Sequence, residues 1–479
     1  MTVNISSEQD LCYLSAGEAM RLFRARKLSP VELLQALIDR AEVVEPKINA
    51  FAFTYYDEVL EKARKAEAKF AKTDGRIRAL EGIPLAVKDE MDIKGKPMTN
   101  GSLYLKDNVS SKTHYSVERL LHAGAIVHAR TTTPEFSCVG VAHSRLHGVT
   151  GTPWNPAYTC GGSSGGSGAA LAAGTAPLAT GSDIGGSIRI PAAACGVVGY
   201  KPPHGRNPFD GPLAYDMYCV MGPMTRTVDD CILMQNVMCG PHPLVNSTLR
   251  PKYRIPRDLK GIEGWKIAYS IDLDYFEIDP AVRRNTERTL DVLRSLGVTV
   301  EAVDFGWSAE IDRAAQDYLD HIFGGYIGAY VDSDPSLASE WAKYCTAAHK
   351  KVTTAAFMRA YEVQDEMARR VGRILEDYQA FICPTMGTHE VPADHEPDQP
   401  LYINGKSVDV VYGWCLCHPF NMLGRCPVLS VPSGIADNGL PTGIQIVARH
   451  LDDVRVFQVG AALERAQPWL DCPERRPRL

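Results

Sequence analysis

Polar capping residues followed by apolar positions at helical spacing stand near the beginning of the chain. Ser15 and Ser29 each precede a glutamate by three residues, and a proline directly follows Ser29. Such an arrangement is typical of helix N-termini, where the serine hydroxyl accepts a backbone N–H and the glutamate reaches back. Apolar residues then recur every three or four positions over residues 33–38. The pattern predicts two opening helices within residues 15–45.

Short apolar runs alternate with helical patterns along the rest of the chain. The runs have the length of strands buried on both faces, whereas the longer periodic segments have the length of helices. This alternation predicts an α/β fold in which helices form layers around a sheet. A helix-rich and charged segment over residues 256–370 is expected to cover one end of that sheet. The predicted strands are residues 83–87, 125–128, 267–270, 428–431 and 444–447, and the predicted helices include residues 117–123 and 280–296.

Composition and charge exclude several classes of protein. The 479 residues are 45% hydrophobic and 23% charged, which is close to the average for globular proteins. The net charge is −6 and no long basic run occurs, so we expect no nucleic-acid partner. The first residues lack the cationic start and apolar core of a signal peptide, and no apolar stretch is suited to span a bilayer. We therefore expect a cytoplasmic protein without a membrane partner.

Thirteen cysteines are scattered through apolar stretches of the chain. Their odd number and their surroundings favour reduced, buried thiols over a disulfide framework. Cys415, Cys417 and His418 form the one spacing that suggests a metal site, but no second pair lies nearby to complete four ligands. We expect neither a metal nor another cofactor.

Glycine and serine are concentrated between Cys160 and Pro191, in the sequence CGGSSGGSGAALAAGTAPLATGSDIGGSIRIP. Glycine at this density indicates backbone that takes positive φ or approaches another group closely. A phosphate is one candidate for that group, but Gly166 is not followed by the lysine of a Walker A motif. A dinucleotide site would need a preceding strand, which is not predicted. The other candidate is a reacting carbonyl group.

The same segment contains Gly161-Gly162-Ser163-Ser164-Gly165, which matches the nucleophile elbow of α/β hydrolases. That elbow would make Ser163 the nucleophile, with an aspartate and a histidine downstream. It also requires a strand immediately before it, whereas residues 155–160 are predicted as loop, and no histidine near the chain end lies in an obvious motif. This short match is therefore expected to mislead.

The whole segment from Gly161 to Ala192 resembles the signature of the amidase signature family. Further similar motifs are spread along the chain, so the resemblance covers nearly all of it. It implies an α/β fold with one amidase domain over residues 1–479, in which a mixed central β-sheet is sandwiched between helices. A signature core over residues 80–230 and C-terminal strands and a helix over residues 380–470 belong to that domain. The further motifs are residues 82–89, 155–156, 196–202, 222–227, 419–421 and 439–445.

The resemblance implies a Ser-Ser-Lys triad, with Ser187 as nucleophile, Ser163 as bridging serine and Lys88 as base. A serine hydroxyl is a poor nucleophile until a base takes its proton, and lysine can be that base only if burial holds it neutral. Lys88 directly follows the apolar run over residues 83–87, where desolvation would lower its pKa. The alternative is a solvated lysine at the end of a strand.

The glycine turn before the proposed nucleophile is expected to form an oxyanion hole from Ile184, Gly185 and Gly186. Successive backbone N–H groups in such a turn can converge on an anion, and glycines leave them unobstructed. The family has its oxyanion hole at these positions. Asp183 and Arg189 are expected to hold the turn as an ion pair instead of reacting.

The sequence identifies the residues of a substrate pocket less closely than it identifies the triad. By family position, Phe136, Ser137 and Cys138 lie beside the acyl site, and the aromatic and methionine-rich residues 215–221 follow downstream. These residues predict an apolar pocket, with membership of the core as an equal alternative. The resemblance implies a small-molecule substrate, either an aryl or alkyl amide or a carbamate (urethane), that is cleaved through an acyl-enzyme.

Two other functions stay open. Members of the family also serve as the glutamine-hydrolysing subunit of amidotransferases, whose signature usually has threonine and glutamine where this chain has Ile184 and Ile190. That departure disfavours the glutaminase, which would work with a partner protein. The intact triad disfavours a non-catalytic binding protein. The sequence does not fix the quaternary state, for which a homodimer is one option.

Overall fold

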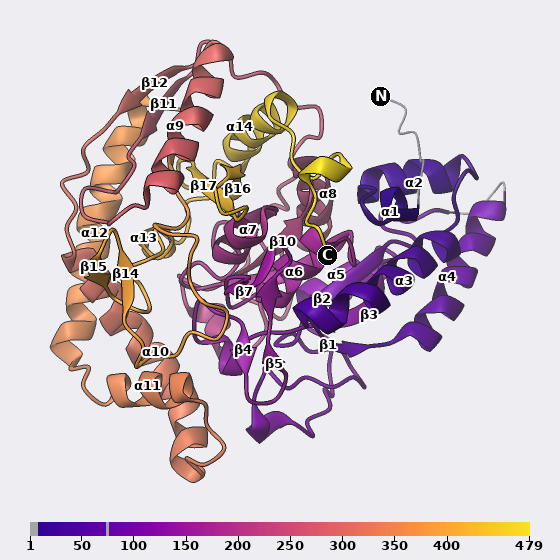
Figure 1. The fold of residues 1–479 in the computed structure, drawn as a ribbon, viewed down its shortest axis with the longest axis horizontal. Coiled ribbons are helices and arrows are strands. Elements are labelled where there is room, and N and C mark those ends of the chain that lie inside the picture. Colours follow the sequence, from indigo (N-terminus) through magenta and orange to yellow (C-terminus); the bar gives the residue numbers. More distant parts are fainter. Residues whose placement is uncertain (1–7, 73–75) are drawn as a thin grey trace.

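The computed structural model describes residues 8–72 and 76–479, and one mixed β-sheet of eleven strands organises them. Helices flank this sheet on both sides (Figure 1). The α/β fold and the mixed central sheet that the sequence predicts are confirmed. In spatial order the strands are β1 (Phe51–Thr54), β3 (Ile126–Thr131), β2 (Pro84–Lys88), β8 (Leu178–Asp183), β10 (Val220–Thr225), β9 (Val198–Lys201), β16 (Val428–Ile435), β17 (Pro441–Val447), β13 (Ala380–Pro384), β11 (Lys266–Tyr269) and β12 (Thr299–Ala302).

Parallel pairing occurs in two parts of the sheet. β2 is parallel to β3 and β8, and β11 is parallel to β12 and β13. The other neighbouring strands are antiparallel. Three two-stranded ribbons lie outside the sheet and consist of β4 (His143–Ser144) with β5 (Gly148–Val149), β6 (Gly151–Thr152) with β7 (Asn155–Thr159), and β14 (Leu401–Ile403) with β15 (Lys406–Val408).

The helices in the described part of the chain differ widely in length. The α-helices are α1 (Glu8–Cys12), α2 (Ala16–Arg24), α3 (Pro30–Ile48), α4 (Tyr56–Ala71), α5 (Tyr115–His122), α6 (Gly165–Ala173), α7 (Arg189–Cys195), α8 (Val228–Met238), α9 (Pro280–Ser295), α10 (Glu310–Ser333), α11 (Glu340–His349), α12 (Thr354–Asp377), α13 (Pro419–Met422) and α14 (Asp453–Ala466). Short 3-10 segments are η1 (Leu103–Leu105), η2 (Glu135–Ser137), η3 (Pro212–Tyr215) and η4 (Pro473–Arg475).

Strand β16 shows how the helices sandwich the sheet. Leu429 lies against Gly460 of α14, whereas the Ser430 hydroxyl donates to the backbone oxygen of Arg189 in α7 at 3.4 Å. Neighbouring residues of a strand point to opposite faces, so α14 and α7 cover opposite faces. α6 packs beside α7, and α8 packs beside α14. The site described below lies where β2 and β8 meet the α6 and α7 side.

The predicted elements are found with small shifts of their ends. All five predicted strands lie in the central sheet as β2, β3, β11, β16 and β17, because each apolar run is buried. Residues 117–123 and 280–296 correspond to α5 and α9. The two predicted opening helices are α2 and α3, and α3 has the complete capping box between Ser29 and Glu32. The short helix α1, which precedes them, is not predicted.

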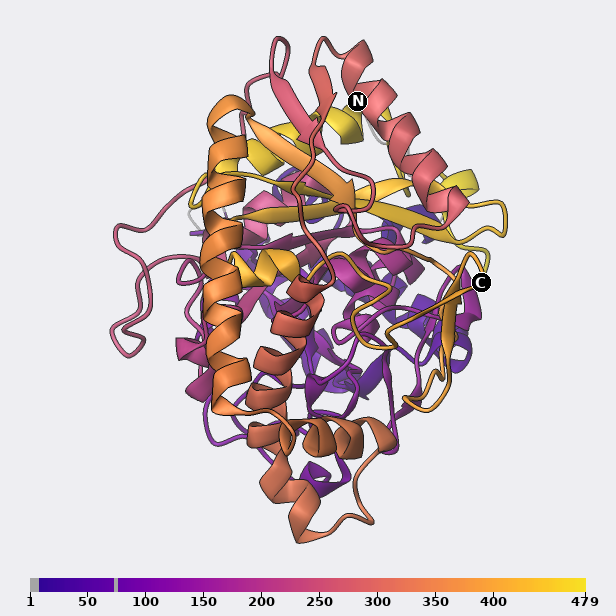
Figure 2. The ribbon, with the colours of Figure 1, turned by 90° about the vertical axis from the view of Figure 1, so that its left-hand side faces the viewer.

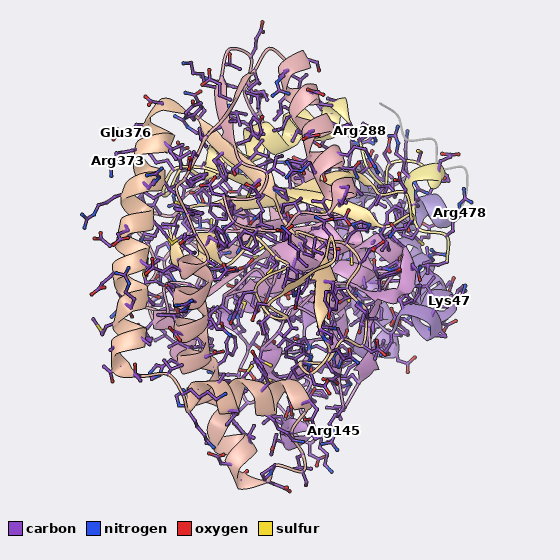
Figure 3. The ribbon with its side chains drawn as sticks, turned by 60° about the vertical axis from the view of Figure 1, so that its left-hand side comes forward. Lys47, Arg145, Arg288, Arg373, Glu376 and Arg478 are labelled. Carbon is purple, nitrogen blue, oxygen red and sulfur yellow. The ribbon has the colours of Figure 1, made fainter. Side chains whose placement is uncertain are left out.

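The segment over residues 256–370 does more than cover an end of the sheet. In addition to helices it supplies β11, which the sequence predicts, and the edge strand β12, which it does not. α10 and α12 pack side by side at the edge of the molecule, as Figures 1 and 2 show. Arg373 and Glu376 on α12 point outward in Figure 3, whereas Val371 and Leu375 are buried. α12 is therefore amphipathic and attached through one stripe.

Two general expectations concern the chemistry of the chain. The thiols from Cys138 to Cys472 are unoxidised, and all of them except Cys472 are buried, as the sequence predicts. None of the helices in residues 8–72 and 76–479 is long and apolar enough to cross a membrane. Location in the cytoplasm stays a prediction.

Candidate active site

Lys88 is the last residue of β2, and its side chain is completely buried. Its ammonium nitrogen Nζ donates to Ser163 Oγ at 2.7 Å and to Ser182 Oγ at 2.8 Å. A carboxylate oxygen of Glu90, Oε2, lies 3.1 Å from the same nitrogen. The alternative of a solvated lysine is therefore wrong, because the side chain is completely buried and Nζ has three protein partners.

The environment of Lys88 acts on its charge in two opposing ways. Burial lowers the pKa of the Lys88 ammonium below its ordinary value, although the nearby Glu90 carboxylate raises it. Burial also opposes ionisation of Glu90, but Lys88 and the hydroxyls of Ser137 and Ser182 lower the pKa of this carboxyl overall. The site thus combines a lysine that is easier to deprotonate than in water with an adjacent carboxylate.

Ser163 stands in the loop between β7 and α6, and a cis peptide bond joins Gly162 to it. Residues 155–160, predicted as loop, contain the short strand β7, which corrects that prediction. β7 nevertheless pairs only with β6 in a ribbon outside the central sheet. A nucleophile elbow needs a sheet strand that leads directly to the serine. The loop before Ser163 therefore differs from that elbow.

Small residues in α6 allow this helix to approach the sheet closely. All nine residues of α6 are buried. A Cβ atom on Gly166 would collide with the Thr132 side chain and with the backbone oxygen of Ala50. Part of the glycine density in the signature segment is thus explained by helix packing, in addition to the turns on either side of α6.

Ser187 lies in the turn between β8 and α7, and its neighbours fix that turn. Arg189 donates from Nε and Nη2 to the two carboxylate oxygens of Asp183, each at 2.9 Å, and both side chains are completely buried. Asn421 Nδ2 donates to Asp183 Oδ1 at 2.7 Å, and Gln445 Oε1 accepts from Arg189 Nη1 at 2.5 Å. The pair holds the turn, in agreement with the structural role expected for it.

The glycines of the turn have different environments. Gly186 has φ +126°, and a Cβ atom there would collide with the side chain of Cys417. Its N–H donates to Asp183 Oδ1 at 2.9 Å. Since that N–H is engaged with a carboxylate, an oxyanion in the cavity would draw on Ile184 and Gly185 in preference to Gly186.

A cavity of about 170 Å³ brings together five of the predicted site residues, whereas Lys88, Gly185 and Gly186 are not part of its lining. Ser163 and Ser187 both line it, as do Phe136, Ser137 and Ile184. The remaining wall combines apolar residues with titratable groups. These further lining residues are Glu90, Asp92, Met98, Asn100, Lys112, His114, Ser182, Phe209, Asp210, Gly211, Leu213, Cys219, Met221, Phe323 and Tyr326. A larger cavity of about 670 Å³ borders Trp154 and Trp469, and its lining includes no member of the triad.

The predicted pocket residues divide into two groups. Cys138 belongs to the hydrophobic core and does not line the cavity, which corrects the expectation for this residue. In the stretch over residues 215–221, Cys219 and Met221 line the cavity. Tyr218 instead stacks on Tyr318 with ring centroids 4.0 Å apart. The aromatic character of that stretch thus serves the core more than the pocket.

Phe136 and Ser137 take unusual backbone conformations, with φ of +53° and +58°. Positive φ costs free energy for residues with a Cβ, and it persists only where the surroundings impose it. Asn100 supplies part of that constraint, since its backbone oxygen accepts from Phe136 N at 2.8 Å and its Oδ1 accepts from Ser137 Oγ at 3.0 Å. The strained turn presents both side chains to the cavity.

Helix α10 contributes to the cavity wall, which the sequence did not indicate. Phe323 and Tyr326 on this helix line the cavity. One turn further along, Tyr330 packs against Phe136 with ring centroids 5.1 Å apart. Their spacing on α10 is an ordinary helical stripe, so only the tertiary structure shows that it faces a site.

The cysteine and histidine cluster near the C-terminal strands does not converge on one point. Cys417 Sγ donates to the backbone oxygen of Thr385 at 3.4 Å, and His418 Nε2 lies 2.6 Å from Asp312 Oδ1. Cys415 Sγ is directed to the backbone oxygens of Val411 and Tyr412. These side chains have separate partners.

Comparison with known proteins shows the family of this chain. The family model for amidases matches residues 32–457. The chain is 31% identical to an acylamidase of Rhodococcus erythropolis, over 97% of this chain and 98% of the relative. It is 32% identical to the A subunit of the glutamyl-tRNA(Gln) amidotransferase of Symbiobacterium thermophilum, over 94% and 96% of the two chains. The crystal structure of a bacterial aryl acylamidase of the amidase signature family superposes with a TM-score of 0.89, at 28% identity and over 95% and 97% of the two chains. The resemblance seen in the sequence is therefore confirmed, and this chain belongs to the amidase signature family of amide hydrolases.

Proposed function

We propose that this protein is a serine hydrolase that cleaves the C–N bond of carboxamides through Ser187, Ser163 and Lys88. The observation that carries this proposal is the 2.7 Å hydrogen bond from a completely buried Lys88 to Ser163, in the wall of the cavity that Ser187 also lines. A buried lysine with a lowered pKa has the property that a general base requires.

The first chemical step is attack by Ser187 Oγ on the substrate carbonyl carbon. The Ser187 proton passes to Ser163, and the proton of Ser163 passes to neutral Lys88, which becomes an ammonium ion. The carbonyl oxygen becomes an oxyanion, for which Ile184 and Gly185 offer backbone N–H groups. The C–O bond to Ser187 forms at the same time.

Collapse of the tetrahedral intermediate breaks the C–N bond. Lys88 returns its proton through Ser163 to the departing nitrogen, which leaves as an amine, and Ser187 stays acylated. Water then attacks the acyl-enzyme while Lys88 and Ser163 again remove a proton, and the acid product leaves as Ser187 regains its hydrogen. After each half-reaction Lys88 is again a neutral amine and Ser163 again carries its proton.

For the substrate we propose aryl or alkyl amides, with carbamates (urethanes) as a further class. Phe136, Met221 and Phe323 give the cavity apolar walls that suit such groups. The acylamidase and the aryl acylamidase named above support the amide class by similarity. Carbamates share the same carbonyl and C–N bond, so the same relay serves them.

A glutamine-hydrolysing subunit is the second candidate, because the A subunit of an amidotransferase is among the relatives. Ile184 and Ile190 are apolar where such glutaminases usually carry threonine and glutamine, and Ile184 lines the cavity. An apolar side chain offers no hydrogen bond to a primary amide, which favours the first candidate. A homodimer stays an expectation that sedimentation would test.

A substrate panel tests the proposal. The purified protein, without any partner, is assayed on p-nitroanilides, fatty amides, aryl carbamates, urea derivatives and glutamine. We expect turnover of anilides or carbamates and none of glutamine. Release of ammonia from glutamine only when an added amidotransferase partner is present, with no turnover elsewhere in the panel, would contradict the proposal.

A further inference from the structure

Glu90 stands in the turn directly after β2, and its two carboxylate oxygens have unequal surroundings. Oε2 lies 3.1 Å from Lys88 Nζ. Oε1 is buried and has no hydrogen-bond partner among the described residues. The side chain is only 12% exposed, and it lines the cavity together with Ser163 and Ser187.

A buried carboxylate oxygen without a donor is unfavourable, because it has lost water and gained no replacement. A ligand that brings a donor into the cavity removes that penalty. Glu90 and Ser163 both contact Lys88 Nζ and both line the cavity, so Glu90 belongs to the same cavity in which Ser163 would return a proton to the leaving nitrogen. The group that distinguishes an amide from an ester at this place is the N–H.

We propose that Glu90 is a specificity-determining residue: Oε1 accepts a hydrogen bond from the N–H of the scissile amide or carbamate, while Oε2 holds Lys88 in position. This assignment rests on the proposed function. A charge-assisted hydrogen bond to the N–H is available to amides and absent for esters of the same shape. The site therefore discriminates between two acyl donors that share every other contact.

The other charged groups near Lys88 are already compensated. Both carboxylate oxygens of Asp183 accept hydrogen bonds from Arg189, one from Nε and one from Nη2. Burial raises the pKa of the Cys219 thiol well above its ordinary value, so this group stays neutral. Glu90 is thus the carboxylate in direct contact with Lys88, and its effect on the pKa of Lys88 is larger than that of Asp183.

The remaining titratable groups of the cavity also have partners or are neutral. Lys112 Nζ donates to Asp210 Oδ1 at 2.8 Å, and Ser110 Oγ donates to Asp92 Oδ1 at 2.7 Å. Burial lowers the pKa of His114 to about 4, which keeps it neutral at assay pH. Asp210 Oδ2 is likewise buried without a hydrogen-bond partner and Asp210 lines the cavity, but Glu90 is the carboxylate of this lining that also contacts Lys88.

The test compares one acyl group on two leaving groups, as in p-nitrobutyranilide and p-nitrophenyl butyrate. The measured quantity is kcat/KM, which reports the steps up to acylation, for the wild type and for Glu90→Gln. Glutamine keeps the shape, but when its oxygen faces Lys88 its NH₂ group faces the substrate N–H as donor against donor. We expect the anilide-to-ester ratio of kcat/KM to fall about tenfold, the size of one lost hydrogen bond to a charged group.

Two further variants make the outcome unambiguous. Asp92→Asn removes one negative charge from the same cavity and is expected to keep the ratio. Glu90→Ala removes both oxygens, is expected to lower the ratio as Glu90→Gln does, and serves if the glutamine variant does not fold. A ratio that is unchanged in the Glu90 variants, or equal losses on both substrates, would overturn the selectivity assignment.

The pH profile tests the second half of the assignment. Since the Glu90 carboxylate favours the charged form of Lys88, Glu90→Gln should shift the acid limb of kcat/KM to lower pH. An unshifted limb would overturn the contact between Glu90 and Lys88 as a functional one. A wild-type protein that hydrolyses neither the anilide nor the ester would instead contradict the proposed function itself.

Discussion

Two buried ion pairs lie close to the proposed nucleophile, and they differ in how completely they are satisfied. Arg189 and Asp183 meet through two hydrogen bonds, and Asn421, Gln445 and the Cys417 backbone oxygen engage further atoms of the pair. Lys88 and Glu90, in contrast, share a single approach of 3.1 Å, and one oxygen of Glu90 has no partner in the described structure.

The difference separates architecture from chemistry. A fully bonded pair in a dry interior has one stable arrangement, so it fixes the turn before Ser187 but cannot easily exchange a proton. A lysine that is held between two hydroxyls and one carboxylate has alternatives of similar energy. Incomplete satisfaction of Lys88 and Glu90 is therefore expected of groups that change their bonds during a reaction.

Removal of Lys88 should give the largest effect. Lys88→Met keeps the length of the side chain and removes the base, so kcat/KM for an anilide should fall at least about a thousandfold. The midpoint of thermal unfolding should fall less than in Asp183→Asn, since the Glu90 side chain is 12% exposed whereas both side chains of the Arg189 pair are completely buried. A strongly lowered midpoint together with nearly normal kcat/KM would reverse the roles of the two pairs.

Removal of the Asp183 charge should act on stability. Asp183→Asn leaves Arg189 buried without a counter-ion, which should lower the free energy of unfolding by about 3–5 kcal/mol. Denaturant titration measures the loss. The matched control is Asp229→Asn, whose pair with Arg257 is 49% exposed on both side chains and should lose no more than about 1 kcal/mol. Equal losses in the two variants would show that burial of the Arg189 pair is not decisive.

The pH dependence of the wild type sharpens the assignment of Lys88. Only the neutral amine accepts a proton, so kcat/KM should rise with pH up to the pKa of Lys88 and level off above it. Because burial lowers this pKa, the plateau should begin below the ordinary lysine range. Below the plateau the slope should be about tenfold per pH unit for one ionisation. A flat or falling profile would exclude a lysine base.

A smaller effect concerns the packing that positions Ser163. Gly166→Ala puts a Cβ against Thr132 and the Ala50 backbone and should lower the free energy of unfolding by about 1–3 kcal/mol. Gly372→Ala is the control, because a Cβ there meets nothing within 4 Å and should stabilise α12 by up to about 1 kcal/mol. If both substitutions stabilise the protein, the close approach of α6 is not a requirement of the fold.

Much of the fold could be predicted because its strands are buried on both faces. The runs that became β2, β3, β11, β16 and β17 are mostly apolar, with single polar residues such as Ser430 and Gln445, and such runs leave a clear signal in the sequence. β8 was not predicted because it contains Thr180, Gly181 and Ser182, which resemble a loop. Those small and polar residues contact Lys88 and the start of α6. The site therefore explains why β8 carries them in place of apolar residues.

The site could be predicted only in part. The long resemblance supplied Ser187, Ser163 and Lys88, and the physics of a buried lysine agreed with it. Ser182 and Glu90 were missed. Ser182 lies 94 residues from Lys88 in the sequence, and the position of Glu90 two residues after Lys88 does not say how far apart the two side chains are. The charged residue two positions after Lys88 was the one available signal. α10 could not be assigned to the cavity, because its aromatic residues follow the same periodicity as any core-facing stripe.

The most direct measurement is the covalent capture of the nucleophile by a fluorophosphonate, located by peptide mass spectrometry. The account predicts that the wild type is labelled on Ser187, that Ser187→Ala is not labelled, and that Ser163→Ala is labelled on Ser187 at a much reduced rate. Undiminished labelling of Ser187→Ala, or a label found on Ser163 in the wild type, would contradict the assignment of Ser187 as nucleophile and of Ser163 as its link to Lys88.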